Sequence, residues 1–150
     1  MRIALHDLAA RVGQEIGRSQ WHEVTQAQVR AFADATGDHQ WLHVDEQRAK
    51  AGPYGTTIAH GYFTLSLAPL LLAEAVQVEG CAAVVNYGID RLRFPAPVPV
   101  GSRVRALVEL LHAADASAGG VQLVWRLTFE IEGGDKPACV AEIVFRYSAA

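Results

Sequence analysis

One strongly apolar helical segment is followed by four long strand-like segments, and this order limits the chain to few architectures. Residues 62–75 are apolar on nearly every side, which is typical of a helix enclosed by other elements. The four predicted strands cover roughly residues 81–94, 102–114, 120–132 and 137–148, with Gly or Pro turns between them. Apolar and polar residues alternate clearly over residues 103–107 and 121–129. Together these features predict one α+β domain over residues 1–150, in which an antiparallel sheet wraps around a central helix.

Local signals divide the chain further. Pro69 is expected to bend the apolar helix, because proline removes one backbone N–H and crowds the preceding turn. A short strand over residues 17–24 is predicted to end at Thr25, which forms a capping-box pattern with Gln28 at the start of a helix. Gly37 is typical of the position just after a helix end. A further short helix is expected to begin at Asp45.

Composition excludes several function classes. The 150 residues are 51% hydrophobic and 19% charged, with a formal net charge of −3 and no block of like charge, so no affinity for nucleic acid is expected. No apolar run approaches the roughly 20 residues that span a bilayer. Cys81 and Cys139 do not form a Cys-x-x-Cys pair, and no signal-peptide pattern precedes them. We therefore expect a cytoplasmic protein with two reduced thiols and no membrane partner.

A candidate acid–base pair follows the predicted helix end. Asp38 comes directly after Gly37, and His43 follows five residues later. A loop of this length can bring a carboxylate and an imidazole to one point, where they share the activation of a single water. Histidine suits this chemistry because an ordinary imidazole changes its protonation state near neutral pH.

Structural interpretations of the same residues remain open. Asp38 can be a turn residue that bonds its own backbone, and His43 can be a histidine of the core. His39 and His43 lie four residues apart, a spacing that suits two zinc ligands on one helix face. The segment lacks the glutamate of the zinc-protease motif and follows a helix stop, so no metal site is predicted.

Residues 32–49 resemble the signature of the (R)-specific enoyl-CoA hydratases, which form the MaoC-like dehydratase family of the hot-dog fold. The matching residues are Phe32, Thr36, Gly37, Asp38, Leu42, His43 and Ala49. Residues 58–61, Ser66 and residues 94–101 also match family positions, so the likeness covers roughly residues 17–148. The combination of Gly-Asp-x-x-x-x-His with Ala-His-Gly is specific, whereas either part alone is weak.

The chain also departs from the usual family pattern. Gln40 and Trp41 stand where most members have Asn-Pro, and the larger Trp41 changes the expected pocket shape. Together with Asn86-Tyr87-Gly88, this segment looks closer to the nodulation-protein-N-like branch of the family. The resemblance implies that Trp41 and Asn86 contribute to substrate binding.

The resemblance implies a reaction and assigns roles to residues. Asp38 and His43 correspond to the catalytic pair, and Ser66 to a serine that supports the active-site geometry. The implied reaction is the hydration of trans-2-enoyl-CoA or acyl-carrier-protein thioesters to (R)-3-hydroxyacyl thioesters, and the reverse dehydration. No metal or redox cofactor is implied, and coenzyme A is part of the substrate. The backbone N–H of Gly61 is expected to bind the thioester oxygen, because helix N-termini present unpaired donors that stabilise developing negative charge.

Three further assignments have structural alternatives. His60 is expected to support the site by a hydrogen bond to the loop that positions Gly61. Ser66 can instead be a small packing residue bonded to a backbone carbonyl. Arg91 and Arg93 share one face of a predicted strand, where they either contact the phosphates of coenzyme A or form a solvated surface. Arg103, Arg105 and Lys50 are equally eligible for the phosphate contact.

The sequence leaves two alternative functions open and predicts an oligomer. A hot-dog thioesterase commonly carries a carboxylate on or beside its central helix. In this chain, Glu74 is the only acidic residue of the predicted central helix. A non-catalytic acyl-CoA-binding subunit is the second rival. Because a single unit leaves sheet edges uncovered, we expect at least a homodimer with sheets joined edge to edge.

Overall fold

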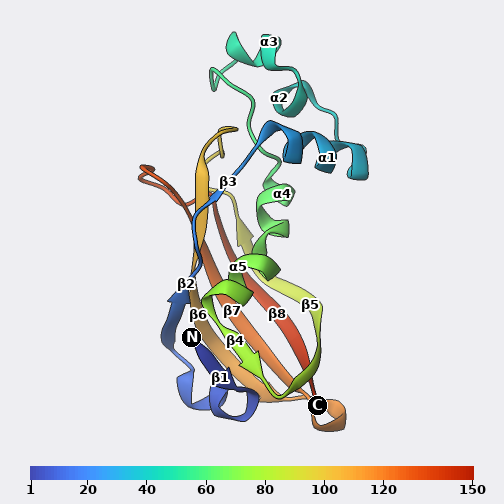
Figure 1. Ribbon diagram of the computed structural model, residues 1–150, viewed down its shortest axis with the longest axis vertical. Helices are drawn as coiled ribbons and strands as arrows, with labels where there is room; N and C mark the ends of the chain where they lie inside the picture. Colours follow the sequence, from blue (N-terminus) through green and yellow to red (C-terminus); the bar gives the residue numbers. More distant parts are fainter.

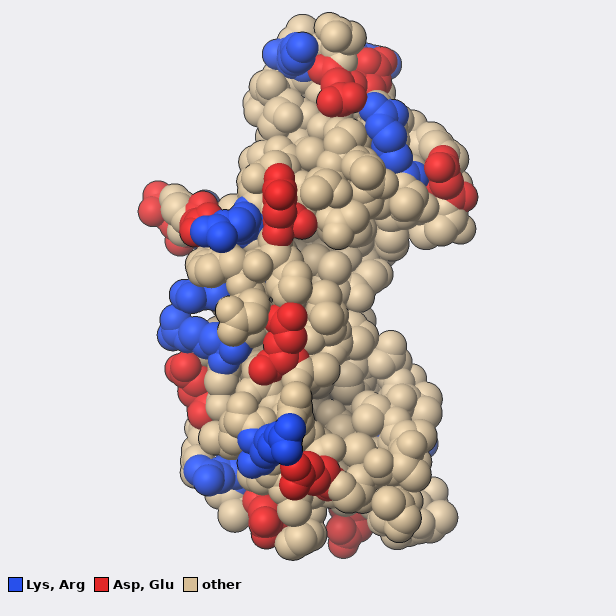
Figure 2. Space-filling model, viewed as in Figure 1, with Lys and Arg blue, Asp and Glu red and all other residues tan.

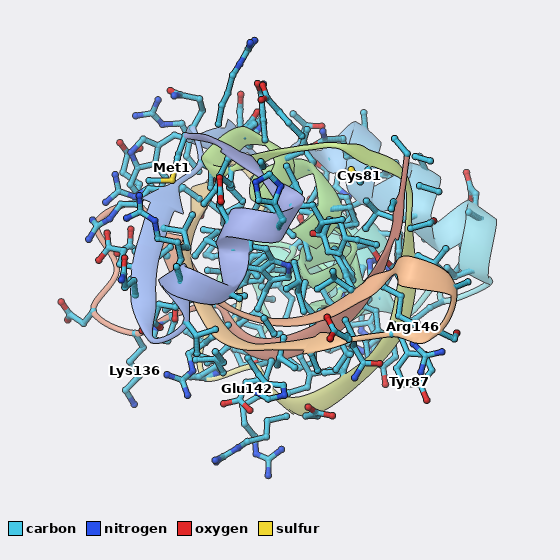
Figure 3. All side chains as sticks on the ribbon, turned by 90° about the horizontal axis from the view of Figure 1, so that it is seen from below. Met1, Cys81, Tyr87, Lys136, Glu142 and Arg146 are labelled. Carbon is cyan, nitrogen blue, oxygen red and sulfur yellow. The ribbon has the colours of Figure 1, made fainter.

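A curved antiparallel sheet wraps around two consecutive helices in the computed structural model, which describes residues 1–150 (Figure 1). Viewed from below, the sheet curls around these helices as an open gutter (Figure 3). Its strands are β2 (Gln14–Arg18), β3 (His22–Glu23), β5 (Cys81–Arg93), β6 (Arg103–Asp115), β7 (Val121–Ile131) and β8 (Cys139–Ala149). The predicted α+β arrangement is therefore confirmed.

The helices have two different locations. Helices α1 (Gln26–Thr36), α2 (Trp41–Val44) and α3 (Glu46–Lys50) form a cap at one end, whereas α4 (Gly61–Ser66) and α5 (Ala68–Ala75) follow the concave side of the sheet (Figure 1). The single bent helix predicted over residues 62–75 is wrong in detail, because the chain interrupts the helix at Leu67. Pro69 lies in the first turn of α5, where its missing N–H costs no helical hydrogen bond.

The N-terminal segment closes the opposite end of the molecule. Strand β1 (Arg2–Ala4) pairs in parallel with β4 (Gln77–Glu79), and the 3-10 helix η1 (Leu5–Arg11) follows β1. None of these elements was predicted, and the strand expected over residues 17–24 is divided into β2 and β3. Both pieces are set by their pairing with β6, which lies far away in the sequence. A second 3-10 turn, η2 (Ser117–Gly119), connects β6 to β7.

The strand order differs from a simple meander. Strands β6, β7 and β8 are neighbours, as their short connections require, but β5 pairs with β8 at the far edge of the sheet. The segment between β5 and β6 crosses the end of the sheet and is held there by the loop before α4: the N–H of Ala59 donates to the carbonyl of Val98 at 2.8 Å. Strand β5 therefore has a free edge.

The two faces of the sheet differ in chemistry. Inward residues of β7, including Trp125 and Phe129, are fully buried, and each such side chain stabilises the fold by about 1.5–3 kcal/mol. The indole N–H of Trp125 donates to the hydroxyl of Tyr147 at 3.1 Å. The outer face carries cross-strand ion pairs such as Arg126–Glu142 at 3.0 Å, which marks it as solvated. None of the helices combines the length and apolar character that crossing a bilayer requires.

Candidate active site

The loop that carries Asp38 begins where α1 ends. The capping box predicted for Thr25 and Gln28 is present in both directions, and Gly37 adopts a left-handed conformation with φ of 81°. This turn directs the chain out of the helix and leaves the Asp38 side chain exposed. A carboxylate oxygen of Asp38 accepts a long hydrogen bond of 3.4 Å from the N–H of Gln40.

His43 lies on the short helix α2 and is buried. Its Nδ1 is 2.8 Å from the carbonyl oxygen of Ile58. A carbonyl only accepts, so Nδ1 carries the hydrogen and Nε2 of the neutral ring keeps its lone pair. The N–H of Ile58 in turn donates to the carbonyl of Leu42 at 3.0 Å. His43 is therefore held in one tautomer and presents Nε2 as a hydrogen-bond acceptor.

Gln26 supports the same helix, and sequence reasoning missed it. Its side-chain N–H donates to the carbonyl of His43 at 2.8 Å, and its oxygen accepts from the Thr57 hydroxyl at 2.6 Å. A glutamine in the first turn of a helix usually faces solvent, so no signal in the sequence marks it as part of this network.

His60 joins the two loops. The residue is 3% exposed, and its Nε2 donates to the carbonyl of Asp38 at 2.9 Å. Its ring stacks on that of His43 with the centroids 3.8 Å apart. One ligand-type atom of each of Asp38, His43 and His60 lies within 4.8 Å of the other two. The structure thus brings the three predicted residues together, and His60 bonds the loop of Asp38 rather than the loop that precedes Gly61.

Gly61 is the first residue of α4, so its N–H has no partner within the helix. A Cβ at this position would lie 3.2–3.3 Å from three ring atoms of Phe94. Glycine therefore allows the Phe94 ring to pack against the start of the helix. Phe94 belongs to a motif recognised in the sequence, but its contact with Gly61 was not predicted.

The hydroxyl of Ser66 makes no hydrogen bond to Asp38, His43 or His60. It donates to the carbonyl of Tyr62 at 2.6 Å, one turn earlier in α4. This is the packing interpretation of a serine inside a helix. Ser66 does line a cavity, described next.

Two adjoining cavities extend between the helices α4 and α5 and the strands β5 and β8. They measure about 440 and 460 Å³ and share Pro69, Asn86 and Phe145 in their walls. Most of the residues that line them are apolar, and Ser66 and Cys81 lie in different cavities of the pair. Together they form a mainly apolar groove alongside the central helices, with Asn86 as a polar group at its middle.

The remaining predicted binding residues lie outside this groove. The Trp41 ring is covered by the guanidinium of Arg48 at 4.4 Å. A Cβ on Gly52 would lie 3.1 Å from the same ring, so Trp41 packs within the cap. Arg91 and Arg93 are exposed on β5, and an Arg93 N–H donates to the carbonyl of Leu92 at 2.7 Å.

Two other side chains considered from the sequence are engaged elsewhere. His39 bonds Asp34 at 2.8 Å, and this hydrogen bond raises the pKa of His39. His39 and His43 therefore turn to different partners. Glu74 uses one carboxylate oxygen to bind the imidazole of His22 at 2.9 Å and the other to accept from the N–H of Gln20 at 3.0 Å. A carboxylate held in this way is poorly suited to activate water as a thioesterase requires.

Comparison with known proteins agrees with this geometry. The family model described as "MaoC like domain" matches residues 7–122. The 3-hydroxyacyl-thioester dehydratase Z of Mycobacterium tuberculosis is 55% identical over 143 residues, which cover 95% of each chain. Nodulation protein N of Rhizobium leguminosarum is 40% identical over 93% of this chain and 88% of its own.

Solved structures share the fold. The (R)-hydratase from A. caviae involved in PHA biosynthesis has a TM-score of 0.65 and 29% identity, and the match covers 89% of this chain and 96% of that one. A MaoC-like dehydratase from Rhodospirillum rubrum has a TM-score of 0.77 at 22% identity, with 99% and 98% covered. These neighbours confirm the predicted hot-dog fold.

Proposed function

The chain belongs to the MaoC-like dehydratase family, and from this membership we propose that it catalyses the (R)-specific hydration of trans-2-enoyl thioesters and the reverse dehydration. The observation that carries the proposal is the convergence of Asp38, His43 and His60 within 4.8 Å, at the end of the molecule where α4 begins with Gly61. A carboxylate beside an imidazole with a free Nε2 lone pair is a competent acid–base pair for one water.

The proposed mechanism uses the His43 tautomer that the hydrogen bond to the Ile58 carbonyl requires. Asp38 and His43 hold a water beside C3 of the alkene, and Nε2 of His43 takes a proton as the water oxygen bonds to C3. The alkene electrons move toward the thioester, whose oxygen accepts the N–H of Gly61. C2 then receives a proton from the same pair, so both side chains return to their initial state. Because both groups act from one side, the addition is syn.

The groove and the arginines suggest how the substrate is held. An apolar acyl chain fits the groove between α4–α5 and β5–β8, where each buried CH₂ contributes about 0.8 kcal/mol. Asn86 contacts the chain at mid-groove. Arg91 and Arg93 lie at the end of β5 that leads to Phe94 and Gly61, and we assign them to the phosphates of coenzyme A or of an acyl carrier protein.

Addition of water to an alkene involves no electron transfer. We therefore propose that the chain uses no redox cofactor. We further propose that Asp38 and His43 activate the water without a metal, and that coenzyme A enters only as part of the substrate. The proposed location of the reaction is the cytoplasm.

A homodimer is part of the proposal. The free edge of β5 presents unpaired backbone groups along a strand of 13 residues. Exposed apolar side chains accompany it, among them Val85 at 60% and Tyr87 at 58% exposure. Figure 2 shows few charges on the lower right surface, where β5 lies in Figure 1. Two β5 strands joined edge to edge would satisfy these groups.

A crotonyl-CoA assay tests the function directly. The wild-type chain should consume the conjugated alkene and release (R)-3-hydroxybutyryl-CoA without free thiol. Asp38→Asn and His43→Gln should each lower the rate about 10²–10⁴-fold, because each removes a positioned acid or base. Asp34→Asn and His39→Gln are matched controls on the same surface and should retain activity. Release of free coenzyme A instead of hydration would contradict the proposal.

A further inference from the structure

His60 contacts both members of the catalytic pair and directly precedes the third group of the site. Its Nε2 donates to the backbone carbonyl of Asp38 at 2.9 Å across 22 residues of sequence. Its ring stacks on His43 with an interplanar angle of 24°. The next residue is Gly61, and His60 itself is the N-terminal flanking residue of α4.

The ring chemistry of His60 argues against packing as its sole purpose. Because the Asp38 carbonyl accepts, the hydrogen lies on Nε2 and the neutral Nδ1 has a lone pair. That Nδ1 is buried and has no hydrogen-bond partner. An unpaired buried acceptor is unfavourable, and a phenyl ring would stack on His43 without it. The N–H donated to Asp38 is therefore the property that distinguishes histidine at this position.

The bond from His60 is the shortest hydrogen bond that Asp38 makes. The other hydrogen bonds of Asp38 are long: its N–H is 3.5 Å from the Thr36 hydroxyl, and its carboxylate is 3.4 Å from the N–H of Gln40. The bond from His60 is the shortest of the three and joins the loop to a buried residue. His60 is in turn packed against Phe32, whose ring centroid is 4.9 Å from its own.

We infer that His60 is a positioning residue for hydration, which sets Asp38 through its N–H and the plane of His43 through stacking. This inference rests on the proposed function. A misplacement of about 1 Å in a catalytic group can cost about 10²-fold in rate. His60 acts on the catalytic pair and not on the groove or the arginines, so its loss should lower kcat and leave KM nearly unchanged.

Two substitutions separate donation from packing. His60→Phe keeps a stacked ring but removes the donor, and kcat for crotonyl-CoA should fall roughly 10²-fold with KM within about twofold of wild type. His60→Gln removes the ring but places an amide N–H near the position of Nε2. Its kcat should therefore be at least about tenfold higher than that of His60→Phe. When His60→Phe is added to the Asp38→Asn protein, kcat should fall little further, because both changes impair the same catalytic group.

Each outcome decides between the alternatives. Wild-type kcat in His60→Phe overturns the inference, as does a raised KM at unchanged kcat. Equal falls in kcat for His60→Phe and His60→Gln, together with a lowered Tm, would assign His60 to packing alone. A wild-type chain without hydratase activity overturns the proposed function, and this inference with it. A wild-type chain that is active while both variants match it overturns the inference alone.

Discussion

At the scale of single residues, the site depends on two histidines that use opposite nitrogens. His43 donates from Nδ1 to Ile58, whereas His60 donates from Nε2 to Asp38. Each imidazole has a carbonyl as its fixed partner, so the ring orientation is set before substrate arrives. The lone pair of His43 is thereby left on Nε2, and one ligand-type atom of His43 lies within 4.8 Å of one of Asp38.

These tautomers can be observed without any assay of activity. In ¹H–¹⁵N correlation spectra of the imidazoles at neutral pH, His43 should show its hydrogen on Nδ1 and His60 on Nε2. His43→Gln and His60→Gln assign the signals. The Nε2–H tautomer of His43 would remove its role as the proton acceptor, because Nε2 would then carry the hydrogen and have no lone pair.

Gly61 leads to a second prediction at this scale. Gly61→Ala brings a methyl group against the Phe94 ring, so kcat/KM should fall roughly tenfold, or by about 1.4 kcal/mol. Phe94→Ala removes the ring that the methyl group meets. In the Phe94→Ala protein, Gly61→Ala should therefore lower kcat/KM much less. Steady-state kinetics of the four proteins of this cycle measure the coupling. An equal loss in both backgrounds would mean that substrate, not Phe94, requires the glycine.

At the scale of elements, the broken central helix creates the groove. Helix α4 ends before Pro69, and α5 resumes with that proline in its first turn. Pro69 contributes to both cavities beside β5. The position of the break therefore shapes the space proposed for the acyl chain.

A larger side chain in the groove should shorten the accepted substrate. Ala73 lines the cavity that also contains Cys81, at the end away from Ser66. Ala73→Phe should exclude part of a long acyl chain from the groove. For each CH₂ group excluded, kcat/KM for long-chain enoyl-CoA should fall roughly fourfold, which corresponds to about 0.8 kcal/mol. Crotonyl-CoA should react as before, and Ala73→Ser is the small-volume control. Equal losses on short and long chains would place the acyl chain elsewhere.

At the scale of the whole molecule, the proposed dimer depends on the free edge of β5. The outer face of the sheet is covered by ion pairs, whereas β5 exposes apolar side chains and unpaired backbone groups. Association through the edge is therefore favoured over association through the face.

A charge on this edge should separate the subunits. Val85→Lys places a cation on β5. The molar mass from light scattering after size exclusion should fall from that of two chains toward that of one, and hydratase activity should be lost. Val12→Lys adds the same charge at an exposed site between η1 and β2 and should leave the dimer intact. A Val85→Lys protein that keeps the wild-type mass would exclude β5 as the joining edge.

Short-range features of this protein could be predicted from its sequence. The capping box of Thr25 and Gln28, the helix end at Gly37 and the alternation along β6 and β7 were all predicted, and the structure contains them. Each depends on residues within a few positions of one another. The motif that contains Asp38, His43 and His60 was recognised for the same reason, since its spacing is visible along the chain.

The tertiary structure decided what depends on distant contacts. The pairing of β5 with β8, the N-terminal strand beside β4 and the bond from His60 to Asp38 all join residues that are far apart in the chain. The sequence also left two roles open for Ser66, and the folded chain commits its hydroxyl to the carbonyl of Tyr62. The helix expected to bend at Pro69 is interrupted at Leu67. A single sequence shows which groups are available, but hydrogen-bond partners, and with them the tautomer of each histidine, are set only when the folded chain brings a particular carbonyl within reach.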